Sequence, residues 1–112
     1  MISRLNALIG KKFDKENYHC YDFIKEILDV PSLKDVSVAN AKNDIEKYSK
    51  IFTKIDVPEE VSIIEMNGMH VGICIDGSHV YHNDKYGVRC ESLRNIKAQY
   101  KNLTYYRFED GK

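Results

Sequence analysis

The sequence predicts a single α+β domain over residues 1–112, in which N-terminal helices pack on an antiparallel sheet meander formed by the second half of the chain. Two observations predict this arrangement: apolar residues recur at helical spacing before Pro31, and the period changes to two after Pro58. The chain has 112 residues, of which 43% are hydrophobic, so it has enough apolar side chains for one core and little room for a second domain.

The predicted helices lie in the first half of the chain. Residues 3–9 form a short amphipathic helix that ends at Gly10. The clearest helix follows Asn17, a suitable N-cap, and its apolar side chains recur at helical spacing: Phe23, Ile24, Ile27 and Leu28. Residues 31–57 are rich in lysine and are expected to form a helical insertion, with a helix around 40–52.

The predicted strands follow Pro58. Alternating apolar residues predict strands at 61–64, 70–75 and 79–82, and Asp76-Gly77 is typical of a hairpin turn between the last two. A short strand at 87–90, a short helix at 91–100 and a final strand at 103–108 complete the expected order.

Composition excludes several classes of function. Seventeen basic residues balance seventeen acidic ones, and a formal net charge of zero disfavours binding to nucleic acid through its phosphates. No apolar run approaches the roughly 18 residues of a membrane-spanning helix, so no membrane partner is expected. The first ten residues lack the pattern of a secretory signal, so we expect synthesis in the cytoplasm, while the final location stays open.

The three cysteines, Cys20, Cys74 and Cys90, are widely spaced and contain no Cys-x-x-Cys pair. This pattern disfavours a zinc knuckle and favours one reactive thiol with two buried thiols. A zinc site made by Cys20, His70 and His82 is disfavoured, because the sequence places no acidic side chain nearby to orient the ligands. No metal and no cofactor are expected.

Cys20 is the candidate nucleophile because it is the first residue of the clearest predicted helix and lies on the same face as the buried apolar side chains of that helix. The positive end of the helix dipole favours the thiolate form, and the unpaired backbone N–H groups there can stabilise an oxyanion. The alternative is a buried structural cysteine.

His70 begins a predicted strand in which Val71, Ile73 and Ile75 point to the core. The imidazole and Gly72 point the other way, and the glycine leaves open space that a substrate could use.

The turn at Asp76-Gly77 decides whether His82 can meet His70. A two-residue turn places His82 across from Val71, on the other face of the sheet. A three-residue loop with Gly77 in the left-handed conformation places His82 directly across from His70. Asp-Gly suits both loops, so both registers stay open, and only the second yields a general base with an orienting partner. The remaining histidines, His19 and His79, are expected at the surface.

These residues resemble the NlpC-type cysteine peptidases of the papain-like superfamily. The similarity lies in Asn17–Leu28 around the cysteine, in the His70–Gly77 strand, and in the second histidine twelve residues after the first. The resemblance implies a papain-like NlpC-type fold and a cysteine hydrolase that cleaves an amide bond, foremost in a peptidoglycan stem peptide. It assigns the nucleophile to Cys20, the general base to His70 and the orienting role to His82.

The resemblance also names residues near the oxyanion or the substrate, namely Tyr18, His19, Tyr21 and Gly72. This chain has His19 where the family usually has Asp, and Phe13 near the family's active-site tyrosine, for which Tyr18 is a substitute.

The end of the chain is similar to the small phage-tail branch of the family, which implies phage tail proteins as partners and delivery in a virion tail. Two alternatives stay open. One is a non-catalytic tail or assembly component with the same fold, and the other is an amidase or acyltransferase that uses the same triad on another substrate.

Overall fold

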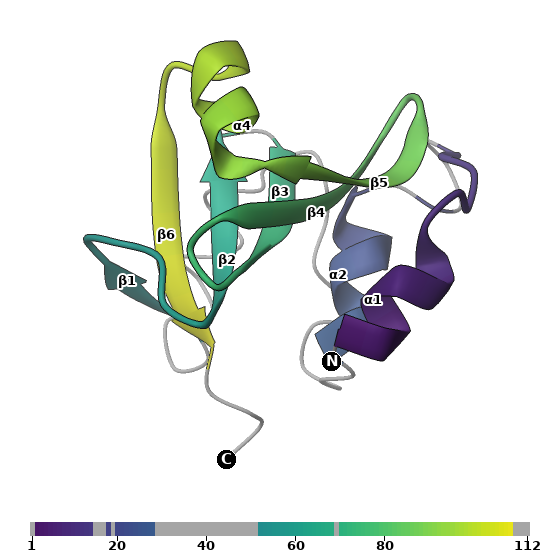
Figure 1. The fold of residues 1–112 in the computed structure, drawn as a ribbon, viewed down its shortest axis with the longest axis horizontal. Helices are drawn as coiled ribbons and strands as arrows, with labels where there is room; N and C mark the ends of the chain where they lie inside the picture. Colours follow the sequence, from purple (N-terminus) through teal and green to yellow (C-terminus); the bar gives the residue numbers. More distant parts are fainter. Residues whose placement is uncertain (1, 15–17, 19, 29–51, 69, 109–112) are drawn as a thin grey trace.

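The computed structural model describes residues 2–14, 18, 20–28, 52–68 and 70–108, and these form the fold drawn in Figure 1. The helices are α1 (Ile2–Leu8), α2 (Cys20–Leu28) and α4 (Leu93–Gln99). The strands are β1 (Phe52–Ile55), β2 (Val61–Met66), β3 (His70–Ile75), β4 (His79–Asp84), β5 (Gly87–Ser92) and β6 (Leu103–Phe108). Among these helices, none has the length and apolar character that a bilayer crossing requires.

The six strands form one antiparallel sheet in the order β1-β6-β2-β3-β4-β5. Strands β2 to β5 follow one another as hairpins, and β6 then returns across the sheet to lie between β2 and β1. The sheet is strongly twisted, since β4 and β5 run at a steep angle to β6 in Figure 1.

The predicted fold class, an α+β papain-like NlpC-type fold with helices on a sheet meander, is wrong. The six-stranded sheet dominates the domain, and the described helices have only seven to nine residues, so the structure is more β-rich than a papain-like fold. The simple meander is also wrong, because β6 leaves the hairpin order to pair with β2 and β1.

One cause of this error is the segment that ends in β1. Apolar residues at helical spacing predicted a helix around 40–52, but Phe52 begins a strand and pairs with Phe108 of β6. The pairing joins segments that are far apart in the sequence, and local periodicity does not report such a contact. The rest of the predicted helix lies outside the described residues.

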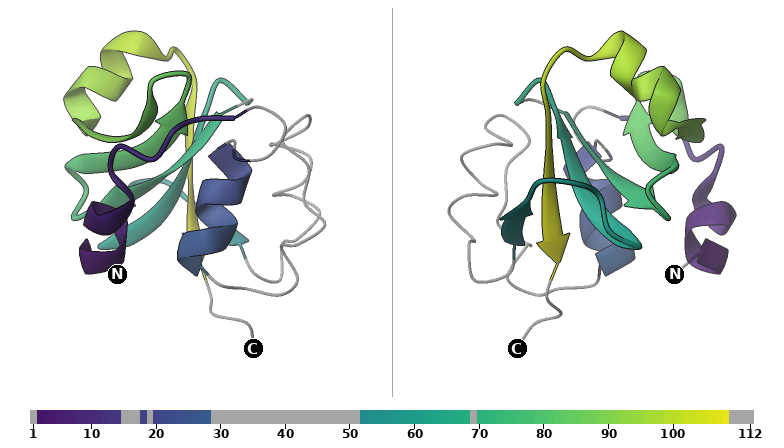
Figure 2. Two further views of the ribbon diagram at one scale, coloured as in Figure 1. Left: turned by 90° about the vertical axis from the view of Figure 1, so that its right-hand side faces the viewer. Right: turned by 60° about the vertical axis from the view of Figure 1, so that its left-hand side comes forward.

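Each face of the sheet has its own hydrophobic cluster, because the side chains of each strand alternate between the faces. On one face, residues of α1 and α2 pack against β3 and its neighbours: Leu5, Phe23, Ile24, Ile27, Ile63, Val71 and Ile73. On the other face, α4 packs against a second set: Leu93, Ile96, Ile64, Met66, Cys74 and Val80. The right-hand view of Figure 2 shows α2 behind the strands and α4 above them.

The segment between α1 and α2 is fastened to the edge strand β5. The Gly10 N–H donates to the Val88 carbonyl at 2.8 Å, and the Val88 N–H donates to the Lys11 carbonyl at 2.9 Å. Gly87 lies against this contact with φ +91°, and a Cβ there would lie 2.8 Å from the Lys11 carbonyl oxygen. Glycine at position 87 therefore permits both the turn and the close approach of the two backbones.

Gly87→Ala should lower the free energy of unfolding more than Gly10→Ala does. Gly10 has nearly the same φ, +92°, but a Cβ there would meet nothing within 4 Å, so it is the matched control. The backbone conformation alone should cost about 1–2 kcal/mol at either position, and the contact with Lys11 should add about 1–3 kcal/mol at Gly87. Urea unfolding followed by circular dichroism measures both, and equal losses would contradict the role of the contact.

Candidate functional site

The register between β3 and β4 places the two predicted catalytic histidines on one face of the sheet. Gly72 pairs with His82 and Ile75 pairs with His79, so three residues, Asp76, Gly77 and Ser78, form the loop. Both registers derived from the sequence are therefore wrong, since His82 lies across from neither Val71 nor His70. His70 is instead the diagonal neighbour of His82, a distance that ring side chains can span.

The two imidazoles are in direct contact. The Nε2 atom of His70 lies 2.8 Å from the Nδ1 atom of His82, and the ring planes are 73° apart. Gly72 makes this contact possible, because a Cβ there would lie 3.0 Å from the Cβ of His82 and 2.8 Å from the Tyr81 carbonyl. β4 therefore fills the space beside Gly72. The sequence had predicted that this space is open to a substrate, and that prediction is wrong.

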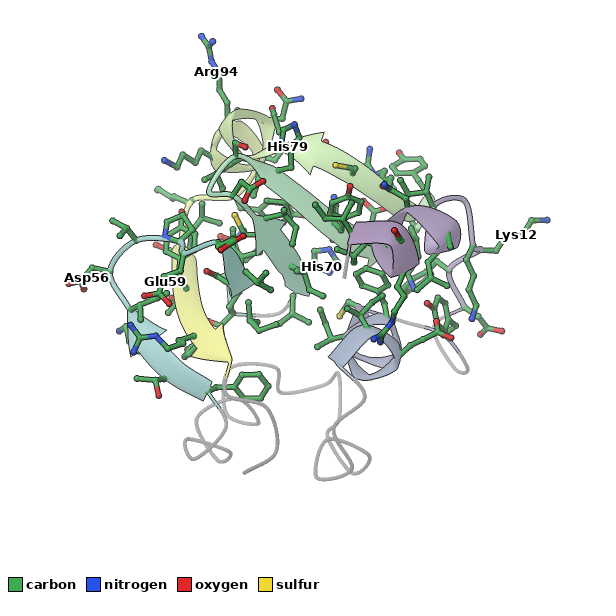
Figure 3. The ribbon with its side chains drawn as sticks, turned by 60° about the horizontal axis from the view of Figure 1, so that its bottom comes forward. Lys12, Asp56, Glu59, His70, His79 and Arg94 are labelled. Atoms are coloured by element: carbon green, nitrogen blue, oxygen red, sulfur yellow. The ribbon has the colours of Figure 1, made fainter. Side chains whose placement is uncertain are left out.

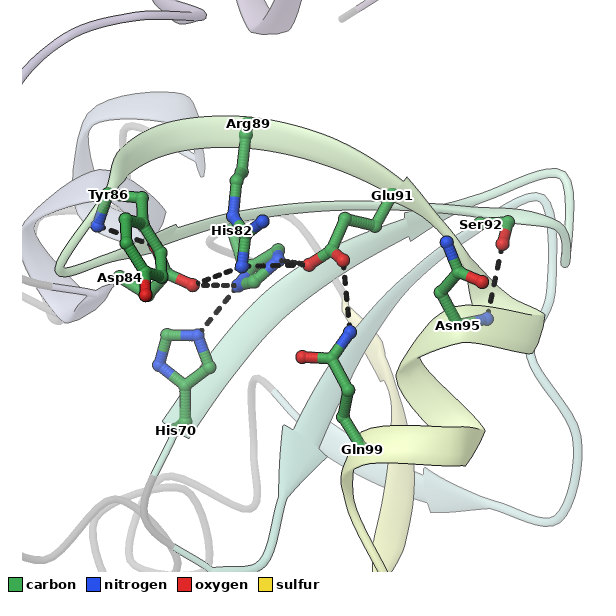
Figure 4. A network of polar contacts seen from close by, with 9 residues as sticks. All are labelled: His70, His82, Asp84, Tyr86, Arg89, Glu91, Ser92, Asn95 and Gln99. Carbon is green, nitrogen blue, oxygen red and sulfur yellow. Dashed lines mark hydrogen bonds and ion pairs between the residues drawn. The ribbon is translucent and has the colours of Figure 1, made fainter.

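A carboxylate continues this hydrogen-bonded pair on the far side of His82, as Figure 4 shows. The Nε2 atom of His82 lies 2.6 Å from Oε2 of Glu91 on β5, and Gln99 of α4 donates to Oε1 of the same carboxylate at 3.0 Å. His82, at the centre of this chain of contacts, is 0% exposed, while His70 and Glu91 on either side of it are half-buried. Glu91, His82 and His70 therefore form one relay across three adjacent strands.

The relay fixes the tautomers of both rings when they are neutral. An ionised Glu91 can only accept, so Nε2 of His82 carries a hydrogen and Nδ1 of His82 has a free lone pair. His70 must then donate through its Nε2, which leaves its Nδ1 without a hydrogen. The arrangement thus presents Nδ1 of His70 as a proton acceptor.

Glu91 is held in its ionised form by its neighbours. Burial acts to raise its pKa, but hydrogen bonds from Gln99 and His82 and the charges of His82 and Arg89 lower the pKa below its usual value. Asp84 behaves in the same way, since burial opposes the hydrogen bond from Arg89 that lowers its pKa. Arg89 pairs with Asp84 at 2.7 Å and lies 3.3 Å from Glu91, so one guanidinium links both acids beside His82.

His70 lies within the body of the molecule, whereas Lys12 and Arg94 project from its surface (Figure 3). The ring of Tyr100, at the end of α4, stacks on the His70 ring, and the two ring centroids are 6.1 Å apart. Burial, followed by the charges of His82 and Arg89, lowers the pKa of His70 to about 4, against the opposing charges of Asp84 and Glu91. The ring is therefore neutral at pH 7, the state in which its Nδ1 can accept a proton.

Cys20 is the first residue of α2 and is 3% exposed, in the cluster on the α2 face of the sheet. Helix α2 packs against β3 and β4, the strands that carry His70 and His82. Cys20 shares its cluster with Val71, whose side chain points to the face opposite His70. The nucleophile candidate and the histidine pair therefore lie on packed elements but on opposite faces of the sheet.

The other two thiols lie in different surroundings. Cys74 is 0% exposed, and burial raises its pKa to about 11. Cys90 is half-buried, and burial raises its pKa also. Both groups are protonated at neutral pH, so neither has the properties of a nucleophile.

Two further residues singled out from the sequence have partners of their own. The Tyr18 hydroxyl donates to Oε1 of Glu26, on a later turn of α2, at 2.7 Å. His79 is exposed and contacts Ser78, as predicted for a surface residue. His19 and the side chain of Tyr21 lie outside the described residues.

Sequence analysis missed Glu91, Arg89, Asp84 and Tyr100. Glu91 had been assigned to the start of a helix at 91–100, but β5 continues to Ser92 and α4 begins at Leu93. The pairing of His82 with Arg89 places Glu91 diagonally beside His82 on the same face. A longer strand over 87–92 together with this register is the signal that would have found it.

Within the described residues, no group of three or more His, Cys, Asp or Glu side chains is arranged to hold a metal ion. Comparison of the chain with protein-family models and with curated proteins finds no match.

The two charged neighbours of the relay should shift the pKa of His70 in opposite directions. Glu91→Gln removes a charge that raises this pKa, so the His70 titration should move below about 4. Arg89→Gln removes a charge that lowers it, so the titration should move upward. Titration of the His70 ring by nuclear magnetic resonance measures both shifts, and movement in the same direction would contradict the proposed arrangement of charges.

The low pKa of His70 should also make the fold sensitive to acid. In the unfolded chain the ring binds a proton below about 6.5, but in the folded chain only near 4, so stability present above pH 6.5 is lost as the pH falls toward 4. The loss should be on the order of 2–3 kcal/mol.

Urea unfolding between pH 7 and pH 4 measures this loss. His70→Gln should flatten the curve relative to wild type, whereas His79→Gln, at an exposed position, should not. Parallel curves for wild type and His70→Gln would show that another group is responsible.

Proposed function

We propose that this protein is a cysteine hydrolase that cleaves an amide bond, with Cys20 as nucleophile, His70 as general base and His82 as the residue that orients the base. The observation that carries the proposal is the Glu91–His82–His70 relay, because it leaves Nδ1 of His70 as a proton acceptor. Helix α2, which begins with Cys20, packs against β3, the strand that carries this acceptor. A nucleophile, a base and an oriented third group are the parts that covalent catalysis requires.

The reaction follows from these roles. Nδ1 of His70 takes the thiol proton as the sulfur of Cys20 attacks the amide carbonyl, and the backbone N–H groups at the start of α2 stabilise the oxyanion. The imidazolium then gives its proton to the leaving amine, and an acyl-enzyme remains. Water, deprotonated by the same Nδ1, attacks the thioester, and the carboxylic acid product and free thiol are released.

During these steps His70 becomes a cation in a buried place. Its Nε2–H stays hydrogen-bonded to His82, and the charge of Glu91 favours the imidazolium. Glu91 acts through His82, in the way that a buried carboxylate supports the imidazole of other hydrolases. We therefore assign Glu91 a positioning and electrostatic role.

The substrate we propose is the stem peptide of peptidoglycan, and the setting is a phage tail. Both rest on the resemblance of the residues around Cys20 and His70 to NlpC-type peptidases, not on the fold. Transfer of the acyl group to an amine in place of water is the same chemistry with another acceptor.

The burial of Cys20, 3% exposed, favours one competing function, a non-catalytic tail or assembly component in which the thiol is structural. Reactivity separates the two. A catalytic Cys20 should be alkylated by iodoacetamide at pH 7 faster than the more exposed Cys90, and His70→Ala should remove this advantage. Labelling of Cys90 first, or of Cys20 only after unfolding, would support the structural role.

Digestion of purified muropeptides, with mass spectrometry of the products, tests the hydrolase directly. Cys20→Ala should abolish cleavage, and His70→Ala should lower kcat by roughly 10²–10⁴-fold, the usual contribution of a general base. His82→Ala should lower it less, and His82→Asn should recover part of the loss by restoring a hydrogen-bond partner for His70.

Cys90→Ala and His79→Ala are the matched controls, since the Cys90 side chain packs on the opposite face of the sheet from Glu91 and His79 is an exposed residue that contacts Ser78. Undiminished cleavage by Cys20→Ala would move the chemistry elsewhere in the chain.

A further inference from the structure

Asn83 lies next to His82 on β4 and points to the opposite face of the sheet. Its side chain is 0% exposed, and its Nδ2 donates a hydrogen bond of 3.0 Å to the backbone carbonyl of Tyr18. Tyr18 lies two residues before Cys20, the first residue of α2. One buried amide thus ties the approach to the thiol-bearing helix to the strand that carries His82.

The Tyr18 carbonyl is also part of an isolated antiparallel bridge with Asp14. It accepts from the Asp14 N–H at 2.8 Å, and the Tyr18 N–H donates to the Asp14 carbonyl at 2.7 Å. A carbonyl oxygen has two lone pairs, so the Asp14 N–H and Asn83 together satisfy it. The amide of Asn83 therefore adds a third hydrogen bond to the backbone pair of Asp14 and Tyr18.

The same hairpin holds this segment at a second place. Val88 of β5 bonds to Gly10 and Lys11, just after α1, while Asn83 of β4 bonds to Tyr18, just before α2. The β4–β5 hairpin therefore forms hydrogen bonds near both ends of the segment that connects α1 and α2. Through His82 it also holds the His70 ring from the other face of the sheet.

We infer that Asn83 is a positioning residue that fixes the start of α2, and with it the thiol of Cys20, relative to His70. The inference rests on the proposed function, because it concerns the distance between the nucleophile and its base. Adjacent residues of one strand then position the two reacting groups: His82 holds the base, and Asn83 holds the nucleophile. Proton transfer from thiol to imidazole requires such a fixed separation.

Two variants test the amide donor. Asn83→Leu has a similar size, removes the donor and buries no charge. Asn83→Asp keeps the shape but cannot donate while ionised, and its acid form donates again at lower pH. Asn95→Asp is the matched control, because Asn95 is exposed and lies on α4, which packs on the other face of the sheet from α2.

Two measurements are made on each variant: amide hydrogen exchange at Asp14, whose N–H is bonded to Tyr18, and the rate of Cys20 alkylation relative to Cys90. In Asn83→Leu, exchange at Asp14 should be about tenfold faster and the Cys20 advantage about tenfold smaller, as expected for loss of one buried hydrogen bond. Asn83→Asp should show the same losses at pH 7 and recover exchange protection at Asp14 on acidification, relative to wild type at the same pH. Exchange at Val88 should not change.

The outcomes separate the two proposals. If wild type and His70→Ala alkylate alike, the proposed function fails and the positioning role falls with it. If they differ but Asn83→Leu alkylates like wild type, the positioning role alone is overturned. Should Asn83→Asp fail to fold, Asn83→Leu decides the question, and faster exchange at Asp14 with an unchanged Cys20 rate shows a purely structural amide.

Discussion

The pairing of Gly72 with His82 is the constraint on which the rest of the site depends. A side chain at position 72 would press on the Cβ of His82 and on the backbone of β4. Without one, β4 lies close enough for the His82 ring to reach diagonally to His70 on one side and to Glu91 on the other. The relay therefore depends on both the register and the glycine. A shift of one residue in the pairing of β3 with β4 would turn His82 to the other face and separate it from His70 and Glu91.

This constraint also explains how a largely buried polar network that contains the ionised Glu91 is tolerated in a small domain. Each ring nitrogen of His82 has a partner, and Glu91 is satisfied by His82 and Gln99 on opposite oxygens. Burial of polar groups costs little when every donor and acceptor is paired, and it strengthens the interactions among them. The same burial disfavours a cation on His70, so the relay favours a neutral base whose lone pair is directed by hydrogen bonds and not by solvent.

Local patterns in the sequence predicted much of the strand content, because the period of two in 70–75 and 79–82 follows the alternation of side chains between the two faces of a strand. They did not predict the sheet order. The position of β6 between β2 and β1 depends on contacts between distant segments, and the apolar spacing that ends at Phe52 suits a helix as well as it suits an edge strand. The helix expected in that segment contributed to the α+β prediction, and the resemblance around Cys20 and His70 implied the papain-like fold; the six-stranded sheet contradicts this fold class.

For the site, the sequence predicted the contact between His70 and His82 but not the exact pairing of their strands. The reason is that residues two apart on a strand point to the same face. The three-residue loop derived from the sequence and the loop in the structure differ by two residues in pairing, and a shift of two returns a side chain to the same face. His70 and His82 therefore meet in both, directly in one and diagonally in the other. The position of Glu91 could not be predicted in this way, because it depends on β5 continuing to Ser92. The sequence pattern had predicted a helix from residue 91 onward. Strand parity alone places His70 and His82 on one face, so an error of two residues in the register does not separate them. The position of the Glu91 carboxylate beside His82 requires the full pairing of β4 with β5.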